Sequence, residues 1–273
     1  MSESKNNILL YYYTKFPTMK NIIEKGELWL CNTQFMNDKS EMSHYIKCIE
    51  EAVLAAGKTD EDDRKRRIEE VFKDQLNKID EHLTYCMCMS KNRDDAAQWE
   101  RYADNGQGVC IIFDSDKLKE ATSHVASLQE IYYIEDAYES KHTELLKKYL
   151  IEEVNKTPEL GSMESAFWNA WVAASAYKHI SFQSEGEVRL IVRENLCWNQ
   201  SLKLEYKMEK WGVREYYPLV ITDKKNYQLE EIIKGIIIGP KANATENIVK
   251  RYLKSLDPVY EKIEVIKSQC PLR

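Results

Sequence analysis

An acid and a base stand two residues apart in an otherwise apolar segment, EVRLIVR, at residues 187–193. If this segment is a strand, Glu187 and Arg189 lie on the same face. Apolar strands normally contain acids only where they are paired or used, because burying an unpaired charge costs free energy. Glu187 could therefore stabilise a positive charge that develops in a substrate, or form a structural ion pair with Arg189. Arg189 could instead bind a pyrophosphate or neutralise Glu185.

Three earlier segments place polar and aromatic side chains at the ends of predicted strands. They are YYYT at 11–14, and residues 28–38 and 98–114. Side chains at strand ends are held rigidly and project into the space above a sheet, which is what a small-molecule site needs. The candidates for ligand contact are Tyr12, Tyr13, Thr14, Asn32 and Phe35, and those that could line the pocket are Asn37, Asp38, Trp99, Tyr102 and Glu185.

Each of these candidates also has an ordinary structural explanation. Thr14 and Asn32 could be turn residues, and Asn37 or Asp38 could cap the helix predicted to follow them. The aromatic candidates could stack on a planar cationic ring, or they could pack in the core. Residue type and spacing leave both interpretations open at these positions.

The sequence lacks the common catalytic and phosphate-binding motifs. It has no GxGxxG after a strand, no P-loop, no HExxH and no GxSxG. His82, Cys86 and Cys88 come nearest to a metal-ligand spacing, but without a second pair nearby this pattern favours core packing. We therefore predict no metal site, and the sequence gives little support for a kinase, dehydrogenase, serine hydrolase or zinc hydrolase.

Charge and cysteine usage narrow the class of protein further. The net charge of −6 disfavours a general nucleic-acid binder, because such proteins usually carry an excess of Lys and Arg. The 7 cysteines are odd in number and mostly lie inside apolar runs, which favours reduced thiols. No apolar run is long enough to span a bilayer, and the N-terminus, MSESKNN, does not resemble a signal peptide. We predict a cytoplasmic protein without membrane contact.

The order of the predicted elements favours one α+β domain over residues 1–273. Strands and helices follow one another without regular βαβ alternation, which favours a mostly antiparallel sheet with flanking helices. Apolar spacing predicts a helical insertion at about 42–81 and further helices at about 136–178. Caps are expected for two other helices, at Asp94 or Asp95 and at Asn243 or Thr245.

Several of these segments, taken in order, resemble a bacterial family of unknown function, the domain of unknown function numbered 2971. The residues that carry the resemblance are Phe35, Asn37, Asp38 and Glu41; Trp99, Tyr102, Ala103 and Gly108; Glu185, Glu187 and Arg189; and Ile238, Gly239 and Pro240. The resemblance covers roughly residues 8–255. It departs from the family pattern at Met36, inserted within Phe-Asn-Asp, and at Lys39, where the family usually has Pro.

The beginning of the chain has a second resemblance. YYYTKFPTMKNIIEKGELWL, residues 11–30, is similar to the first strand, helix and strand of the ADP-ribosyltransferase fold. This resemblance implies a split or curved sheet, with NAD as co-substrate in a pocket that Tyr12, Tyr13 and Thr14 open. It also implies that Asn32 stands where that fold often has Ser, and that Glu187 is the catalytic acid. Tyr12 departs from the commoner pattern, which has His there.

Three functions are therefore expected as alternatives. The first is an NAD-dependent ADP-ribosyltransferase-like enzyme, a toxin or anti-phage effector that modifies nucleic acid or protein and has an antitoxin as a candidate partner. The second is a module that senses a nucleotide or a partner without turnover. The third is a nuclease-like effector that uses Asp38, Glu41 and Glu187 with Mg²⁺.

Overall fold

The computed structural model describes residues 8–33, 70, 73–74, 84–134, 175–193, 203–209, 212–223 and 227–272. The chain divides into two compact units. The first unit consists of Met1–Asn32, Tyr85–Gln129 and Glu185–Arg273, and the second of Thr33–Thr84 and Glu130–Ser184. The helices predicted within 42–81 and 136–178 fall in the second unit and lie almost entirely outside the described residues. The single-domain organisation stays a prediction.

The second unit contributes a small parallel sheet to the described part of the chain. It pairs β6 (Tyr132–Ile134) with β7 (Tyr177–His179). A 3-10 helix, η3 (Ile180–Glu185), follows β7. The prediction of a helix up to residue 178 is therefore wrong at its end, because Tyr177 and Lys178 belong to a strand. Tyr177 is of a type that favours strands, and the pairing of β7 with β6 outweighs the helical spacing of the sequence there.

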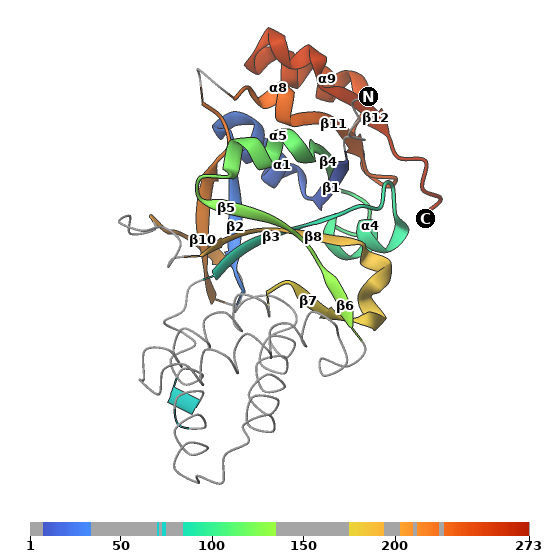
Figure 1. The fold of residues 1–273 in the computed structure, drawn as a ribbon. Coiled ribbons are helices and arrows are strands. Elements are labelled where there is room, and N and C mark those ends of the chain that lie inside the picture. Colours follow the sequence, from blue (N-terminus) through green and yellow to red (C-terminus); the bar gives the residue numbers. More distant parts are fainter. Residues whose placement is uncertain are drawn as a thin grey trace, which may run out of the picture. The chain divides into compact units, whose positions relative to one another are not determined.

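A large mixed sheet forms the first unit (Figure 1). Its order is β12-β11-β4-β1-β3-β2-β10-β9, and β8 pairs with both β3 and β5 off this path. Six of its strand pairs are antiparallel, and β11 with β12 is parallel. The strands are β1 (Leu9–Thr14), β2 (Glu27–Asn32), β3 (Thr84–Ser90), β4 (Val109–Asp114), β5 (Ala126–Glu130), β8 (Glu187–Arg193), β9 (Glu205–Glu209), β10 (Gly212–Val220), β11 (Ile233–Ile238) and β12 (Glu264–Lys267). The predicted α+β class with a mostly antiparallel sheet is confirmed.

Local sequence explains where the helices begin and end. The helices of the first unit are α1 (Phe16–Lys25), α4 (Ala96–Tyr102), α5 (Ser115–Thr122), α8 (Leu229–Ile232) and α9 (Glu246–Leu256). Asp95 caps α4 by accepting from the backbone N–H of Gln98, and Thr245 caps α9 in the same way from Ile248. Each is one of the two residues that the sequence offers as a cap. Gly26 ends α1 with a φ of +65°.

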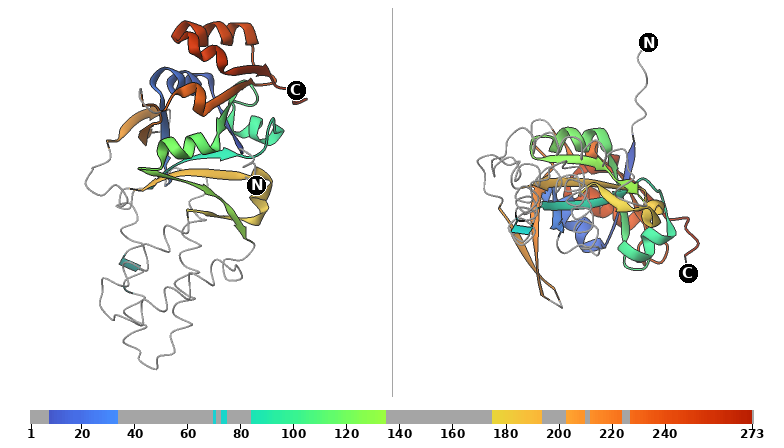
Figure 2. Two further views of the ribbon diagram at one scale, coloured as in Figure 1. Left: turned by 45° about the horizontal axis from the view of Figure 1, so that its top comes forward. Right: turned by 60° about the horizontal axis from the view of Figure 1, so that its bottom comes forward.

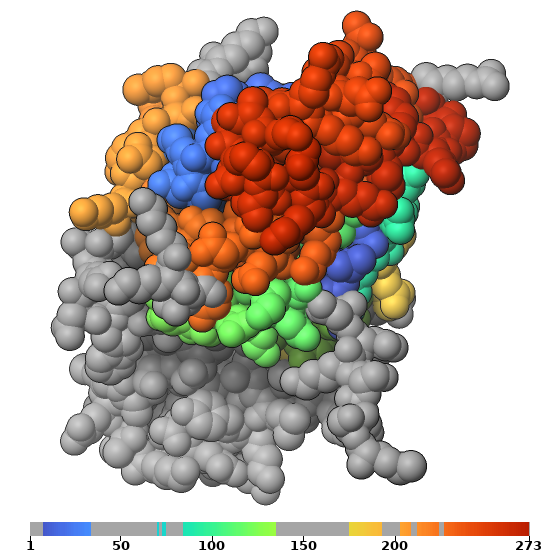
Figure 3. Space-filling model, turned by 90° about the horizontal axis from the view of Figure 1, so that it is seen from above, coloured from blue at the N-terminus to red at the C-terminus, as the bar shows by residue number. Residues whose placement is uncertain are grey.

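The C-terminal helix packs beside the first one. The Tyr252 hydroxyl on α9 donates to the Glu24 carboxylate on α1 at 3.3 Å. Figure 3 shows the two elements, red and blue, next to each other on one face of the molecule. The segment after α9 begins with a 3-10 helix, η5 (Pro258–Lys262), because Pro258 cannot donate to a ladder and Asp257 caps the turn, and it ends in β12. No helix within the described ranges is long and apolar enough to cross a membrane.

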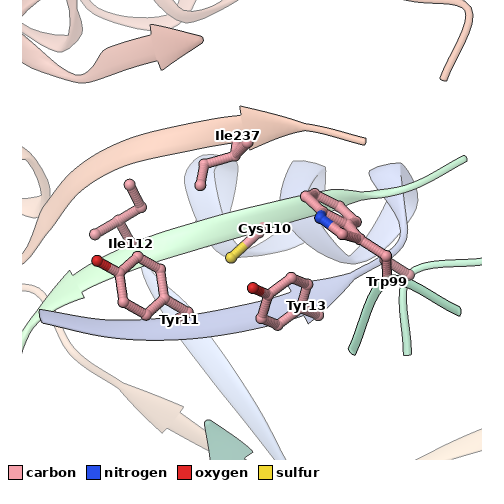
Figure 4. Close-up of a cluster of buried hydrophobic side chains, with 7 residues drawn as sticks. Tyr11, Tyr13, Trp99, Cys110, Ile112 and Ile237 are labelled. Carbon is pink, nitrogen blue, oxygen red and sulfur yellow. The ribbon is translucent and has the colours of Figure 1, made fainter. Parts of the chain in front are cut away.

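Tyr11 and Tyr13 project from one face of β1 into a buried cluster (Figure 4). The cluster also contains Trp99, Ala103, Cys110, Ile112 and Ile237. The rings of Tyr13 and Trp99 meet edge to face, with centroids 5.0 Å apart. This cluster attaches α4 to the middle of the sheet, and it leaves Tyr12 and Thr14 on the opposite face of β1.

Candidate functional site

The start of β8 is fastened to the end of β3. The Lys91 backbone N–H donates to the Gly186 carbonyl at 2.8 Å, and the Ser90 hydroxyl donates to the Glu185 carbonyl at 2.6 Å. Gly186 has a φ of +53°, in the left-handed region that favours glycine. These contacts fix the position from which the acidic side chains on either side of Gly186 leave the backbone.

Glu187 and Arg189 form a buried ion pair on one face of β8. Arg189 donates from Nε to Oε1 of Glu187 at 2.7 Å and from Nη2 to Oε2 at 3.4 Å. Both side chains are only 6% exposed. The ion pair that the sequence leaves open is therefore present, and removing either partner would leave a buried charge without its counter-charge.

Two thiols of β3 lie beside this ion pair. The Cys88 side chain is hydrogen-bonded to that of Cys86 and is close enough to Glu187 and Arg189 to feel both charges. Cys88 is partly exposed and Cys86 is buried. The spacing of the two thiols puts them on the same face of their strand, so the ion pair borders a thiol-rich patch.

Tyr12 of β1 lies within electrostatic range of the thiols. Its electrostatic neighbours are Cys88 and Cys31, and its hydroxyl is hydrogen-bonded to the side chain of Thr14. Tyr12 is half-buried and Thr14 is buried. We name the set formed by Tyr12, Thr14, Cys86, Cys88, Glu187 and Arg189 the Cys88 cluster. It joins residues that are more than 170 positions apart in the chain.

Burial, hydrogen bonds and neighbouring charges determine which groups of the Cys88 cluster are ionised at neutral pH. The hydrogen bond with Cys86, burial and the nearby Glu187 charge raise the pKa of Cys88 well above its ordinary value. Burial raises the pKa of Tyr12, and the hydrogen bond with Thr14 only partly opposes this. Burial would lower the pKa of Arg189, but Cys88 and Glu187 raise it more, so it remains a cation. At neutral pH the cluster offers a neutral thiol, a neutral phenol and one ion pair.

Other predicted site residues lie elsewhere in the first unit. Tyr13 and Trp99 belong to the core, with 4% and 0% exposure, and the Tyr13 hydroxyl donates to the Asn92 carbonyl at 2.8 Å. Their contacts are those of core residues. Tyr102 shares a helix with Trp99 but is 41% exposed. Alternation alone does not say which face of β1 is the core face, and this explains why Tyr12 and Tyr13 could not be told apart in the sequence.

Asn32 belongs to a different polar group. Its Nδ2 donates to Glu215 Oε1 at 3.0 Å, and the Tyr85 hydroxyl donates to the same oxygen at 2.6 Å. Asn32 follows Cys31 along β2, so the two side chains leave the strand on opposite faces. The structure thus puts Asn32 on the opposite face of β2 from Cys31, the β2 residue that lies within electrostatic range of Tyr12.

Glu185 has a partner of its own. Its Oε1 accepts from Nη1 of Arg101 on α4 at 2.8 Å; Glu185 is 8% exposed and Arg101 54%. The remaining candidates, Phe35, Asn37 and Asp38, lie outside the described residues, as does Glu41. Within the described residues, no group of three or more His, Cys, Asp and Glu side chains is arranged to hold a metal ion.

Sequence reasoning assigned Cys86 and Cys88 to core packing, and it missed their position beside the ion pair and the partners of the polar candidates. Cys31, Cys88, Arg101 and Glu215 join their sites through strand pairing and helix packing, and no local pattern marks them. One signal was available: Cys86 and Cys88 share a strand face, and EVRLIVR had to pair with some strand. Their meeting follows only from the sheet order.

Comparisons with known proteins agree with the family resemblance. Residues 98–190 match the profile of the family described as "Protein of unknown function (DUF2971)". This match includes α4 from Gln98 onward, β4 and the Glu187–Arg189 segment, and it confirms the resemblance over about a third of the chain. A search of curated proteins found no match. A search of solved structures also found none.

Proposed function

We propose that the chain is an NAD-dependent ADP-ribosyltransferase-like enzyme and that the Cys88 cluster is its site. One observation carries the proposal. Tyr12 of the first strand, which is hydrogen-bonded to Thr14, and Glu187 of a late strand both lie within electrostatic range of one thiol, that of Cys88, although they are far apart in the sequence. Resemblance to the ADP-ribosyltransferase fold implies this combination of an early hydroxyl pair and a late acid.

The chemistry suits these side chains. Breaking the bond between nicotinamide and ribose builds positive charge on the ribose, and a nearby carboxylate such as Glu187 stabilises that charge. The bond to nicotinamide breaks with its electron pair, a bond to the acceptor nucleophile forms, and the acceptor proton passes to Glu187 or to water. Arg189, held as a cation, suits a pyrophosphate. Tyr12 stays neutral at pH 7, so it can donate a hydrogen bond.

The ion pair sets a condition on this mechanism. Glu187 is 6% exposed and is bound by Arg189 in the structure. NAD must therefore take over one of the contacts between the two side chains, for example by drawing Arg189 toward its phosphates. A carboxylate released in this way would face the ribose only when substrate is bound, which protects the protein from carrying an unpaired buried charge.

The same ion pair favours a second candidate function, a module that senses a nucleotide or partner without turnover. A carboxylate whose charge is already compensated is a weaker stabiliser of a second cation. Such a module would bind through Arg189 and the hydroxyls of the Cys88 cluster. It predicts that NAD or another nucleotide raises the unfolding temperature and is recovered unchanged.

Incubation with NAD labelled in the adenylate part, together with cell extract, distinguishes the two. The enzyme should release nicotinamide and transfer label to protein or nucleic acid, and Glu187→Gln should reduce both by at least about 100-fold. Glu261→Gln is the matched control, because it removes an acid from an exposed ion pair with Lys254. Absence of nicotinamide release by the wild type, or equal release by Glu187→Gln, would exclude the enzyme.

A further inference from the structure

The sheet of the first unit ends in a two-stranded ribbon with one open side. β9 pairs with β10 from Glu205↔Tyr216 to Glu209↔Gly212, and the ribbon extends past the neighbouring strands (Figure 2). β9 is the last strand in the sheet order, and no strand in the described part of the chain pairs with its outer side. Every second backbone N–H and C=O of β9 therefore points away from β10.

The side chains of β9 are unusually exposed for apolar residues. Tyr206 is 60% exposed and Met208 is 77% exposed, and they share one face of the strand. Val213, which lies directly opposite Met208 on β10, is 48% exposed on the same face. Proteins usually protect an open edge with charge, proline or a bulge, because such an edge templates further strand pairing. β9 carries charges at Glu205, Lys207 and Glu209, but its other face presents an aromatic ring and a thioether to solvent.

We propose that a second copy of this chain pairs antiparallel with β9, with Tyr206 on the two-fold axis. A two-fold interface uses the same surface on both copies, so the sequence of β9 must complement itself. With Tyr206 opposite Tyr206 of the other copy, Glu205 lies opposite Lys207 and Leu204 lies opposite Met208. Each charged residue then meets the opposite charge, and each apolar residue meets an apolar one.

Neighbouring registers lack this complementarity. If the axis passes through Lys207, that lysine faces its own copy. An axis through Glu205 brings the two Glu205 residues together and sets Lys203 against Lys207. Like charges directly opposite each other destabilise a ladder. Tyr206 would keep an apolar partner in either of these registers, Met208 or Leu204, so it is the charged residues that distinguish them. Charge complementarity thus favours the register with Tyr206 on the two-fold axis. It also indicates that the partner of this edge is a second copy of the chain.

The size of the interface predicts a weak, reversible dimer. One short ladder buries less surface than the roughly 1,200 Å² of a stable interface. The dimer fraction should therefore depend on protein concentration, and the affinity of the dimer should depend on the two symmetry-related Glu205–Lys207 pairs. The Tyr206 rings, each opposite Glu215 of its own ribbon, would meet across the axis.

Sedimentation equilibrium of the full chain with charge-reversed variants tests the register. Glu205→Lys and Lys207→Glu should each weaken dimerisation by about tenfold, because two pairs change from attraction to repulsion. The double variant Glu205→Lys/Lys207→Glu should restore it, since the pairs are then reversed but complementary. Lys250→Glu, an equal charge change on exposed Lys250 of α9, should have no effect. A monomer at all concentrations, or a dimer indifferent to the single reversals, would overturn the proposal.

Crosslinking provides a second readout that does not depend on affinity. Residues on the two-fold axis of an antiparallel ladder are close enough for a disulfide. Tyr206→Cys should therefore form a covalent dimer when diamide accepts the two electrons and two protons that the thiols lose. Val213→Cys is the matched control, since it is exposed on the same ribbon but lies on the inner strand. Failure of Tyr206→Cys to crosslink, or equal crosslinking by Val213→Cys, would contradict the Tyr206 axis.

Discussion

At the scale of single residues, the buried Glu187–Arg189 pair governs both stability and any chemistry of the Cys88 cluster. Both side chains are 6% exposed, so Glu187→Gln leaves the guanidinium without its counter-charge in the interior. We expect this substitution to lower the free energy of unfolding by about 3 kcal/mol, measured by urea denaturation. A change within about 0.5 kcal/mol of wild type would contradict the contact as described.

The matched experiment replaces both partners at once. Glu187→Leu/Arg189→Met fills a similar volume without buried charge, and such replacements are often neutral or stabilising. The double variant should therefore recover most of the stability that Glu187→Gln loses. This variant matters beyond stability, because it separates the structural contribution of the pair from its chemistry.

Cys88 gives a prediction that depends on pH. The hydrogen bond with Cys86, burial and the Glu187 charge raise the pKa of Cys88 well above its ordinary value, so in the folded protein the unreactive thiol persists into alkaline solution. Alkylation of Cys88 by iodoacetamide, followed by mass spectrometry, should be slow at pH 8 and should still be increasing above pH about 9, where the rate in urea levels off. If the alkylation rate of Cys88 in the folded protein levels off at the same pH as the rate in urea, the pKa of Cys88 is not raised.

At the scale of elements, the loops that follow α4 and β11 pack tightly on each other at two glycines of the family pattern, Gly108 and Gly239. Gly108 donates its N–H to the Ala103 carbonyl at 2.8 Å, and Gly239 donates to the Gly108 carbonyl at 2.9 Å. A Cβ on Gly108 would stand 2.2 Å from the Thr14 carbonyl oxygen, and one on Gly239 would stand 2.4 Å from the Gly106 carbonyl oxygen. These glycines are required by close backbone approach, and they hold the end of β1 in place.

This close backbone packing predicts the effect of adding one methyl group at Gly239. Gly239→Ala should lower the free energy of unfolding by about 3 kcal/mol, because its Cβ meets backbone that cannot move aside. Gln107→Ala, at an exposed neighbouring position, should stay within about 0.5 kcal/mol of wild type. Thermal or urea unfolding of both variants checks this. Equal stability of the two variants would show that the turn tolerates a side chain at Gly239.

The elements were largely predictable from the sequence, whereas the sites were not. The apolar run of β4 and the caps Asp95 and Thr245 carry local signals that tertiary packing does not override. β5 could not be predicted, because ASLQE has no clear apolar alternation, and it forms a strand through its pairing with β8. The Cys88 cluster depends on strand order, which local patterns do not encode. Tyr12 and Glu187 were chosen through resemblance to a fold, and Tyr13 was chosen with them although it belongs to the core.

At the scale of the whole molecule, the first unit is assembled from three separate stretches of chain. β1 lies between β4 and β3, and β8 pairs with β3, so the Cys88 cluster exists only when distant segments have joined. The family match at residues 98–190 contains Glu187 and Arg189 but not the first strand. A function of the cluster therefore depends on parts of the chain both inside and outside the matched stretch.

The central claim is that Glu187 and Arg189 serve chemistry on NAD as well as folding. Nicotinamide release from NAD, measured for wild type and for the folded Glu187→Leu/Arg189→Met variant side by side, tests it most directly. We predict that the wild type releases nicotinamide and that the variant, although it keeps most of the wild-type stability, releases none above the uncatalysed rate. Release at the same rate by both proteins, or by neither, would contradict the claim and leave the pair with a purely structural role.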